Sequence, residues 1–395
     1  MSKDLSMKNM KITDSVTLAI TAKAKKMRAD GIDVVSFGAG EPDFNTPKHI
    51  RDAAIAAIEK GSNGYTASSG MPELRQAICD KLKEDNQLDY KPENIVVSNG
   101  AKHSLHNVLM AICNPGDEVI VPVPYWVSYP ELVKLADAVP VLVETPEENG
   151  FKYDGVSLEK AITSKTKAII LNSPNNPTGT VYTENELKTI ADIAVKHDIY
   201  VISDEIYEKL TYDGRHVSIA SFGKEIKDLT IVVNGMSKAY AMTGWRIGYT
   251  ASTKEIANIM TNVQSHATSN PNTVAQYASI EALKGDQEPI NEMVKAFIER
   301  RNYMVDKINS IEGISCRKPE GAFYVMVNIS KTIGKTFRGK TIHSSMDFAE
   351  YLLDSVKVAV IPGSGFGTDN YVRLSYATSL DNIKEGLNRI EAALK

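Results

Sequence analysis

Between residues 48 and 285, short runs of β-branched and other apolar residues alternate with amphipathic patterns of helical period. The apolar runs cover residues 95–98, 118–121, 139–143, 167–171, 199–203, 230–233 and 246–250. Helical patterns separate most of them, at residues 105–113, 127–136, 184–197 and 254–266. One helix start is explicit, since Thr183 followed by Glu186 forms a capping box. Alternation of this kind predicts an α/β/α layered fold with a mostly parallel central sheet.

The C-terminal third of the chain has a different order of elements. A long helical pattern near residues 288–311 leads into four short segments of mixed strand and helix character, at 321–327, 348–353, 358–361 and 371–376. The chain has 395 residues, 43% of them apolar, so it can bury more than one core of ordinary size. We therefore expect an N-terminal arm that joins the small domain (1–47), a large α/β domain (48–285) and a small α+β domain (286–395).

Charge and cysteine content restrict the partners and the compartment. The 45 basic and 49 acidic residues are spread along the chain without a block of one sign, which disfavours a nucleic-acid groove or a membrane-binding surface. Three widely separated cysteines fit a reducing compartment. The N-terminus lacks the apolar stretch of a secretory signal, and no apolar run approaches the roughly 20 residues of a membrane span. We expect a soluble cytoplasmic protein that acts on small molecules.

Polar residues follow four of the predicted strands at the point where each strand ends. They are residues 99–102, residues 172–179, Asp204, and the pair Ser237-Lys238. In open α/β sheets, ligands bind at the edge formed by the carboxyl ends of the strands. Four such segments in one chain predict a binding site at this edge.

Lys238 is the candidate for covalent chemistry at that edge. Ser237 offers a hydroxyl beside it, and Arg246 offers a planar guanidinium suited to a phosphate. Asp204 emerges from a strongly apolar strand, and a buried carboxylate needs a cationic partner such as a protonated pyridine nitrogen. A helix N-cap or a surface turn remains the alternative for Asp204, as a solvated surface amine does for Lys238. The combination favours a phosphorylated aldehyde cofactor.

Further segments have weaker signals. Residues 100–102 open a helix after a strand, which leaves backbone N–H groups free for an anion. Trp126 follows another strand and either packs in the core or stacks on a flat cofactor. His103 and His106 have a spacing compatible with metal ligation, but no further ligands accompany them, so no metal is expected. The glycine-rich residues 363–367 lack dinucleotide-binding spacing and are interpreted as a flexible loop.

Seven segments together carry a family resemblance. They are GAGEPDF at 38–44, GYT at 64–66, PYWVSYP at 124–130, SPNNPTG at 173–179, SDEIY at 203–207, SK at 237–238 with GWRIG at 244–248, and YVRLS at 371–375. In this order they resemble fold-type I aminotransferases that depend on pyridoxal phosphate, and specifically bacterial aspartate aminotransferases of subgroup Ib. The resemblance covers nearly the whole chain.

The resemblance implies a set of cofactor contacts. Lys238 carries pyridoxal 5′-phosphate as a Schiff base and moves the proton between the substrate α-carbon and the cofactor. Asp204 pairs with the ring nitrogen, and Trp126 stacks on the ring. Tyr207 and Asn176 bond the phenolic oxygen. The phosphate lies against Gly100, Ala101, Ser237, Arg246 and, from the neighbouring subunit, Tyr65, which implies a homodimer with composite sites.

The resemblance also implies how substrate binds. Arg373, the Gly40 backbone, Asn176 and Trp126 hold the amino acid, with Arg373 at the α-carboxylate. Animal-type members use an arginine of the partner subunit for the distal carboxylate, and no equivalent is evident here. The subgroup's substitute corresponds to Lys102, Ser15 and Thr17. This set favours aspartate or glutamate as amino donor and a 2-oxo acid such as 2-oxoglutarate as acceptor, in a ping-pong reaction.

Three alternatives remain open from the sequence. The first is a transaminase for alanine, aromatic amino acids, arogenate or prephenate. The second is a pyridoxal-phosphate β-lyase on the same fold. The third, a transcriptional regulator with an aminotransferase-like module, is disfavoured because no basic helix-turn-helix pattern precedes residue 48.

Overall fold

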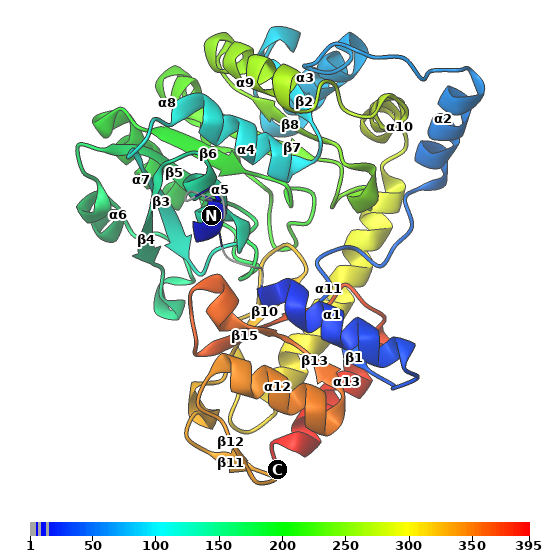
Figure 1. Ribbon diagram of the computed structural model, residues 1–395, viewed down its shortest axis with the longest axis vertical. Coiled ribbons are helices and arrows are strands. Elements are labelled where there is room, and N and C mark those ends of the chain that lie inside the picture. Colours follow the sequence, from blue (N-terminus) through cyan, green and yellow to red (C-terminus); the bar gives the residue numbers. More distant parts are fainter. Residues whose placement is uncertain (1–4, 7–8, 13–15) are drawn as a thin grey trace.

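A seven-stranded sheet forms the centre of the larger part of the molecule. This part occupies the upper half of Figure 1. The computed structural model describes residues 5–6, 9–12 and 16–395. The strand order is β2 (Ile95–Ser98), β8 (Gly248–Ala251), β7 (Thr230–Gly235), β6 (Tyr200–Asp204), β5 (Thr166–Asn172), β3 (Glu118–Val123) and β4 (Val139–Glu144). All pairs are parallel except those of β8, which runs antiparallel to β2 and β7. The predicted mostly parallel sheet is confirmed.

Alternation of side chains along the strands creates one apolar layer on each face of the sheet. Ile170 and Ile202 belong to a buried cluster with α4 (Ala101–Ile112), α5 (Ser128–Leu135) and α9 (Lys254–Ala267). The preceding residues, Ile169 and Val201, belong to a second cluster with α6 (Gly155–Ala161) and α7 (Glu184–His197) on the opposite face. The side-chain period of two in a strand requires this division. Strands buried on both faces therefore show continuous apolar runs, as parallel sheets do.

The predicted bounds of helix α7 agree with the structure, whereas the predicted start of strand β8 does not. Helix α7 has the predicted bounds, and its capping box is formed: Thr183 N donates to Glu186 Oε2 (2.7 Å). Strand β8 begins at Gly248 instead of residue 246, because Arg246 has a φ of 57° that no strand residue adopts. The local cap signal located a helix start, whereas nothing in the local pattern indicated the left-handed residue before β8.

Several helices of the larger part were not predicted from the sequence: α2 (Lys48–Glu59), α3 (Pro72–Asn86), α6, α8 (Lys224–Leu229) and α10 (Thr273–Lys284). The last of these buries only small or polar side chains, namely Ala275, Gln276, Ala278, Ser279 and Ala282. Small residues permit close packing of α10 against α2 and α3. They also weaken the apolar periodicity from which helices are predicted.

The smaller part is an α+β layer around an antiparallel sheet, in the lower half of Figure 1. The sheet order is β14 (Ile361–Pro362), β15 (Tyr371–Ser375), β10 (Tyr324–Asn328) and β9 (Ser315–Cys316). Helices α12 (Ser345–Val356) and α13 (Leu380–Ala393) accompany it, and α11 (Glu288–Asn309) runs between the two parts (Figure 1). The short remaining elements are η1 (Asn9–Lys11), η2 (Pro92–Asn94), η3 (Glu147–Asn149), η4 (Ile219–Phe222), η5 (Thr243–Trp245), η6 (Ser330–Thr332), β11 (Thr336–Phe337) and β12 (Lys340–Thr341).

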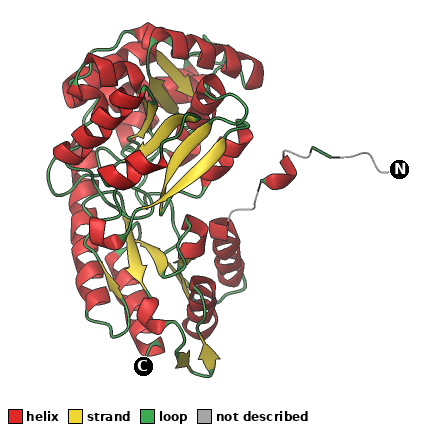
Figure 2. Cartoon of the chain, turned by 90° about the vertical axis from the view of Figure 1, so that its left-hand side faces the viewer, coloured by secondary structure: helices red, strands yellow, loops and turns green. Residues whose placement is uncertain are grey.

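The N-terminal segment packs against this smaller part. Helix α1 (Val16–Ala29) contacts β14 and β13 (Val358–Ala359), and β1 (Val35–Ser36) pairs in parallel with β13. Figure 2 shows both parts from the side, with the two sheets seen one above the other. We propose the domain division 1–47, 48–285 and 286–395 on the basis of these contacts.

Residues 363–367 differ from the flexible loop that the sequence suggested. Residues Gly363–Phe366 form a 3-10 turn, η7, and Phe366 is fully buried. Its ring lies 5.0 Å from the Arg373 guanidinium. Phe366 packs against apolar side chains of the small sheet, such as Met326 and Ile361. This packing orders residues 363–367, although their glycine-rich composition predicts a flexible loop. No helix within the described residues is long and apolar enough to cross a membrane.

Candidate active site

A cavity of about 700 Å³ lies at the carboxyl edge of the large sheet. Three regions of the chain that are far apart in sequence line it. The strand ends and the loops after them contribute Ala101, Lys102, Trp126, Asn176, Asp204, Tyr207, Ser237, Lys238 and Arg246. The N-terminal region contributes Gly38 and Gly40, and the small sheet contributes Tyr324 and Arg373. The structure thus brings together the four polar segments that follow predicted strands.

Lys238 lies in the loop that follows β7, three residues after the end of the strand, and is half-buried in this cleft. Its Nζ donates a hydrogen bond to Gly40 O at 2.6 Å. Burial and the nearby Arg373 guanidinium lower the pKa of Lys238 from 10.5 to about 8, because both disfavour the charged amine. Such an amine loses its proton close to neutral pH, so it can act as a nucleophile or a base.

Asp204 ends β6 and is buried. Its Oδ2 accepts a hydrogen bond from Tyr129 Oη at 2.7 Å, and its Oδ1 accepts one from Ile206 N at 3.2 Å. Burial dominates these hydrogen bonds and raises the pKa of Asp204 to about 6. No lysine or arginine of the described chain forms an ion pair with it. A surface turn is therefore the wrong interpretation, and the carboxylate is suited to a cationic partner supplied by a ligand.

An anion-binding corner lies beside these two residues. Gly100, with a φ of 88°, precedes α4, whose first backbone N–H groups have no partner within the helix. A Cβ at residue 100 would collide with the Arg246 guanidinium, so glycine permits their close approach. Arg246 Nη1 donates to Thr243 O at 2.7 Å, which fixes the orientation of the side chain. Ser237 is buried next to Lys238. These donors suit a phosphate group.

Arg373 is a buried cation on β15. Its Nη1 donates to Asn176 Oδ1 at 2.9 Å, and its Cζ lies 4.3 Å from the Tyr324 ring centre. Its buried Nε has no hydrogen-bond partner, and no described carboxylate forms an ion pair with it. A buried guanidinium without a counter-ion is costly unless a ligand supplies one. A substrate carboxylate fits this requirement.

Aromatic side chains and a further cation, Lys102, also line the cleft. Trp126 packs edge-on against Tyr129, with ring centres 5.3 Å apart. The Lys102 ammonium stands 5.0 Å from the Trp126 ring centre, and burial, with Arg246 nearby, lowers its pKa. Tyr207 Oη lies 3.0 Å from Tyr324 Oη. The cleft lining therefore includes Lys102 beside Trp126 as well as Arg373 beside Tyr324.

Three residues singled out from the sequence are not placed in the cleft by the described part of the chain, and only for Tyr65 is the side chain described. Tyr65 is 92% exposed and lies outside it. Ser15 lies outside the described residues, and Thr17 belongs to the first turn of α1, where only the backbone is described. Their contributions to a site stay predictions.

Other lining residues were missed by the sequence patterns. Tyr129 lies one helical turn after Trp126, and that spacing within the PYWVSYP segment could have indicated it. Tyr324 sits in a strand of the small sheet, where no local signal points to a ligand. Lys25 and Arg28 of α1 also line the cavity and belong to no motif.

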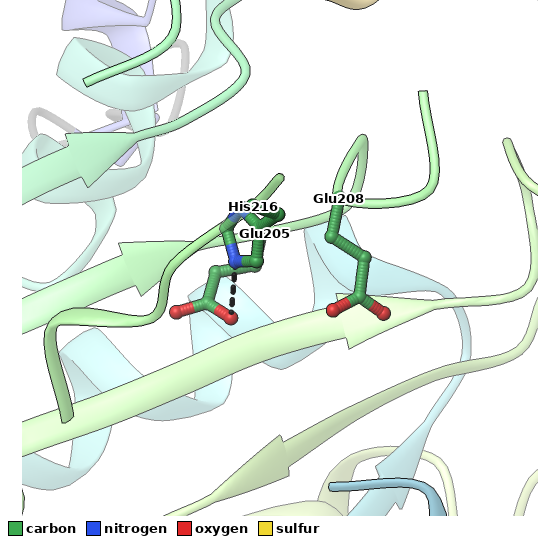
Figure 3. A group of neighbouring side chains, drawn as sticks. All are labelled: Glu205, Glu208 and His216. Atoms are coloured by element: carbon green, nitrogen blue, oxygen red, sulfur yellow. Dashed lines mark hydrogen bonds and ion pairs between the residues drawn. The ribbon is translucent and has the colours of Figure 1, made fainter. Parts of the chain in front are cut away.

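A separate cluster of potential metal ligands lies away from the cleft. It consists of Glu205, Glu208 and His216, shown in Figure 3, and none of them lines the cavity. His216 Nε2 is 3.0 Å from Glu205 Oε2, and Lys81 forms an ion pair with Glu208. Because the Lys81 ammonium already neutralises Glu208, the cluster is a protein ion-pair network and gives no reason to expect a metal.

Comparison with known proteins assigns the family. The model of class I and II aminotransferases matches residues 32–390. The chain belongs to this aminotransferase family. The aspartate aminotransferase of Bacillus sp. (strain YM-2) is 54% identical to it over 385 residues, 97% of each chain.

Solved structures agree with this assignment. The aspartate aminotransferase of Rhizobium meliloti superposes with a TM-score of 0.96 and 43% identity, covering 100% of this aminotransferase and 99% of that chain. The enzyme from Thermus thermophilus, solved with maleate, superposes with a TM-score of 0.93 and 42% identity, covering 99% and 100%. The fold-type I architecture predicted from the sequence is confirmed.

The cofactor of this aminotransferase is pyridoxal 5′-phosphate, and the cleft fits it. Asp204 is a buried carboxylate that forms no ion pair within the described chain, which suits the protonated ring nitrogen. The Gly100 turn, Ser237 and Arg246 offer a phosphate cradle, and Lys238 offers an amine for the aldehyde. Trp126, Tyr207 and Asn176 could contact the ring and its phenolic oxygen. When bound, the cofactor draws electrons from the substrate α-carbon and so acidifies its proton.

Proposed function

We propose that this aminotransferase moves the amino group of L-aspartate or L-glutamate to a 2-oxo acid such as 2-oxoglutarate in two half-reactions. The observation that carries the proposal is that two cations, Arg373 beside Tyr324 and Lys102 beside Trp126, line the same cleft. A dicarboxylate would place one carboxylate at each cation. The relative from Thermus thermophilus was solved with maleate, which is also a dicarboxylate.

In this proposal each residue of the cleft has a physical task. Arg373 binds the substrate α-carboxylate, with Asn176 and the Gly40 backbone beside it. Lys238 holds the cofactor covalently between turnovers and, once released, takes the α-proton on its Nζ. The neighbouring Arg373 and burial keep its pKa near 8, so the free amine is accessible at neutral pH. Asp204 keeps the ring nitrogen protonated, and Tyr207 with Asn176 bonds the phenolic oxygen.

A panel of amino donors tests the substrate assignment. The purified protein is assayed with each of several amino donors: aspartate, glutamate, alanine and aromatic amino acids. Prephenate is assayed as an acceptor with a suitable donor. We expect aspartate with 2-oxoglutarate to have the highest kcat/KM. Release of pyruvate and ammonia without a 2-oxo acid would indicate a β-lyase. Preference for alanine or aromatic donors would contradict the dicarboxylate proposal.

Lys102→Met should lower kcat/KM for aspartate by roughly ten- to a hundredfold, because one charge-assisted hydrogen bond is worth about 1.5–3 kcal/mol. Methionine keeps an apolar stem against Trp126 and removes only the charge. Alanine has no distal carboxylate, so its lower activity should fall less. Steady-state kinetics with both donors measure the difference, and equal losses would remove Lys102 from the distal site.

We propose a homodimer in which Tyr65 reaches the phosphate of the partner's site. Support comes from the exposure of Tyr65 together with Ile55 and Ile58 on the nearby α2, an apolar surface that one chain leaves uncovered. Sedimentation at assay concentration should give a dimer. A fully active monomer would contradict composite sites.

Mixed dimers give a sharper test. We expect the Lys238→Ala variant to lose transaminase activity. The Tyr65→Ala variant should have reduced activity when the cofactor concentration is low. Co-expressed, they should form heterodimers in which one site has both native residues. Activity well above that of either parent is expected. Activity equal to the mean of the two parents would show that Tyr65 acts only within its own chain.

A cytoplasmic location is proposed from the thiols. Cys79, Cys113 and Cys316 are all free. Burial raises the pKa of each, to about 11 for Cys79 and about 12 for the other two, so they are poor thiolates. Free, unreactive thiols fit a reducing compartment.

A further inference from the structure

Tyr129 lines the cleft and contacts the carboxylate of Asp204, the group suited to the ring nitrogen of the cofactor. It lies in the first turn of α5 and is 1% exposed. Its Oη donates to Asp204 Oδ2 at 2.7 Å, the shorter of the two hydrogen bonds that the carboxylate accepts. Burial and the Asp204 charge raise the pKa of Tyr129 well above 10, so the hydroxyl stays protonated and acts as a donor.

The same turn also orients the stacking ring. Tyr129 N donates to Trp126 O at 2.9 Å, and the two rings meet edge to face at 82°. Trp126 and Asp204 both line the cleft. Tyr129 therefore joins the two groups that would contact the ring face and the ring nitrogen of a bound pyridine.

We propose that Tyr129 is a positioning residue that keeps Asp204 ionised and aimed at the ring nitrogen of pyridoxal 5′-phosphate. This inference rests on the role proposed for Asp204. Through that carboxylate, the hydroxyl strengthens cofactor binding and maintains the positive charge on the ring without touching the substrate.

The physical effect has a definite sign. A hydrogen bond to the charged form of a carboxylate favours that form. Without the Tyr129 hydroxyl, burial acts on Asp204 with less opposition, and its pKa rises above the present value of about 6. A protonated Asp204 cannot stabilise a cationic ring nitrogen. When the pH is lowered, a variant without this hydroxyl should therefore start to lose affinity for the cofactor at a higher pH than the wild type does.

The test compares Tyr129→Phe with Tyr153→Phe. Tyr153 is also buried, and its Oη donates to Ile170 O at 3.1 Å, away from the cleft lining. Both variants lose one buried hydroxyl, so Tyr153→Phe controls for the effect of that loss on stability. Thermal unfolding of the apoproteins measures the stability of each variant. The dissociation constant of pyridoxal 5′-phosphate is determined by titration of each apoprotein across pH 5–9.

We expect Tyr129→Phe to bind the cofactor about ten- to a hundredfold more weakly at neutral pH, from the loss of one hydrogen bond to a charged group. Its affinity should fall off at a higher pH than that of the wild type. Tyr153→Phe should keep wild-type affinity and pH dependence, even if it melts at a lower temperature. Wild-type affinity and pH dependence in Tyr129→Phe, or equal effects in both variants, would overturn the inference.

Asp204→Asn separates this inference from the function on which it rests. If this variant loses affinity and pH dependence while Tyr129→Phe does not, the role of Asp204 stands and that of Tyr129 falls. If Asp204→Asn binds the cofactor as the wild type does, with the same pH dependence, the proposed role of Asp204 fails and the inference fails with it.

Discussion

Lys238→Ala is expected to abolish turnover, with a loss in kcat of at least about 10³-fold, because one side chain supplies both the covalent link and the general base. The half-buried position in the cleft and the pKa of about 8 support both tasks. Reduction of the wild-type holoenzyme with borohydride should trap the cofactor on the peptide that contains Lys238. Mass spectrometry of the digest identifies that peptide.

Lys254→Ala provides the matched control for this experiment. Lys254 is exposed and pairs with Glu93 outside the cleft. Its removal should change neither labelling nor kcat. Recovery of the reduced cofactor on another lysine, or substantial turnover by Lys238→Ala, would refute the assignment.

Arg373→Lys is expected to lower kcat/KM for every amino donor by roughly 10²–10³-fold. Lysine keeps the charge but not the planar fork that binds a carboxylate through two parallel hydrogen bonds. The α-carboxylate is common to all donors, so aspartate and alanine should lose similar factors. The cofactor should remain bound, because Arg373 lies apart from the Gly100 turn and Arg246. Steady-state kinetics and the absorption spectrum of the holoenzyme measure both expectations.

Arg301→Lys is a control for the cost of changing a buried arginine. Arg301 is also buried, pairs with Asp213 and donates to Pro319 O at 3.0 Å, outside the cleft. Its substitution should lower the melting temperature and leave kcat/KM near the wild-type value. Donor-dependent losses in Arg373→Lys, large for aspartate and absent for alanine, would instead place Arg373 at the distal carboxylate.

The two substitutions at cationic residues of the substrate site therefore have different signatures. Arg373→Lys should affect all donors alike, whereas Lys102→Met should affect dicarboxylic donors most. Measured together on aspartate and alanine, they assign each carboxylate of the substrate to one of these two cations. This comparison does not depend on the absolute activity of either variant.

Local patterns predicted much of the larger part of the molecule. Residues 184–197 form the predicted helix, and all seven predicted runs became neighbouring strands of one sheet. Apolar period and capping chemistry act over a few residues, so they can be recognised in sequence. Helix α10 was not predicted, because its buried side chains are small or polar and leave only a weak apolar period in the sequence.

The sequence by itself determined that Asn176, Asp204, Ser237 and Lys238 would gather, because carboxyl ends of parallel strands share one edge. It could not determine which residues of the small sheet would face them. Only the packing of that sheet against the large one brings Arg373 within hydrogen-bond distance of Asn176 and near enough to Lys238 to lower its pKa. The Tyr129–Asp204 hydrogen bond likewise exists only after α5 packs on the large sheet, against β3 and β4. Charge interactions and hydrogen bonds depend on distances in space, and those distances are set by the tertiary fold.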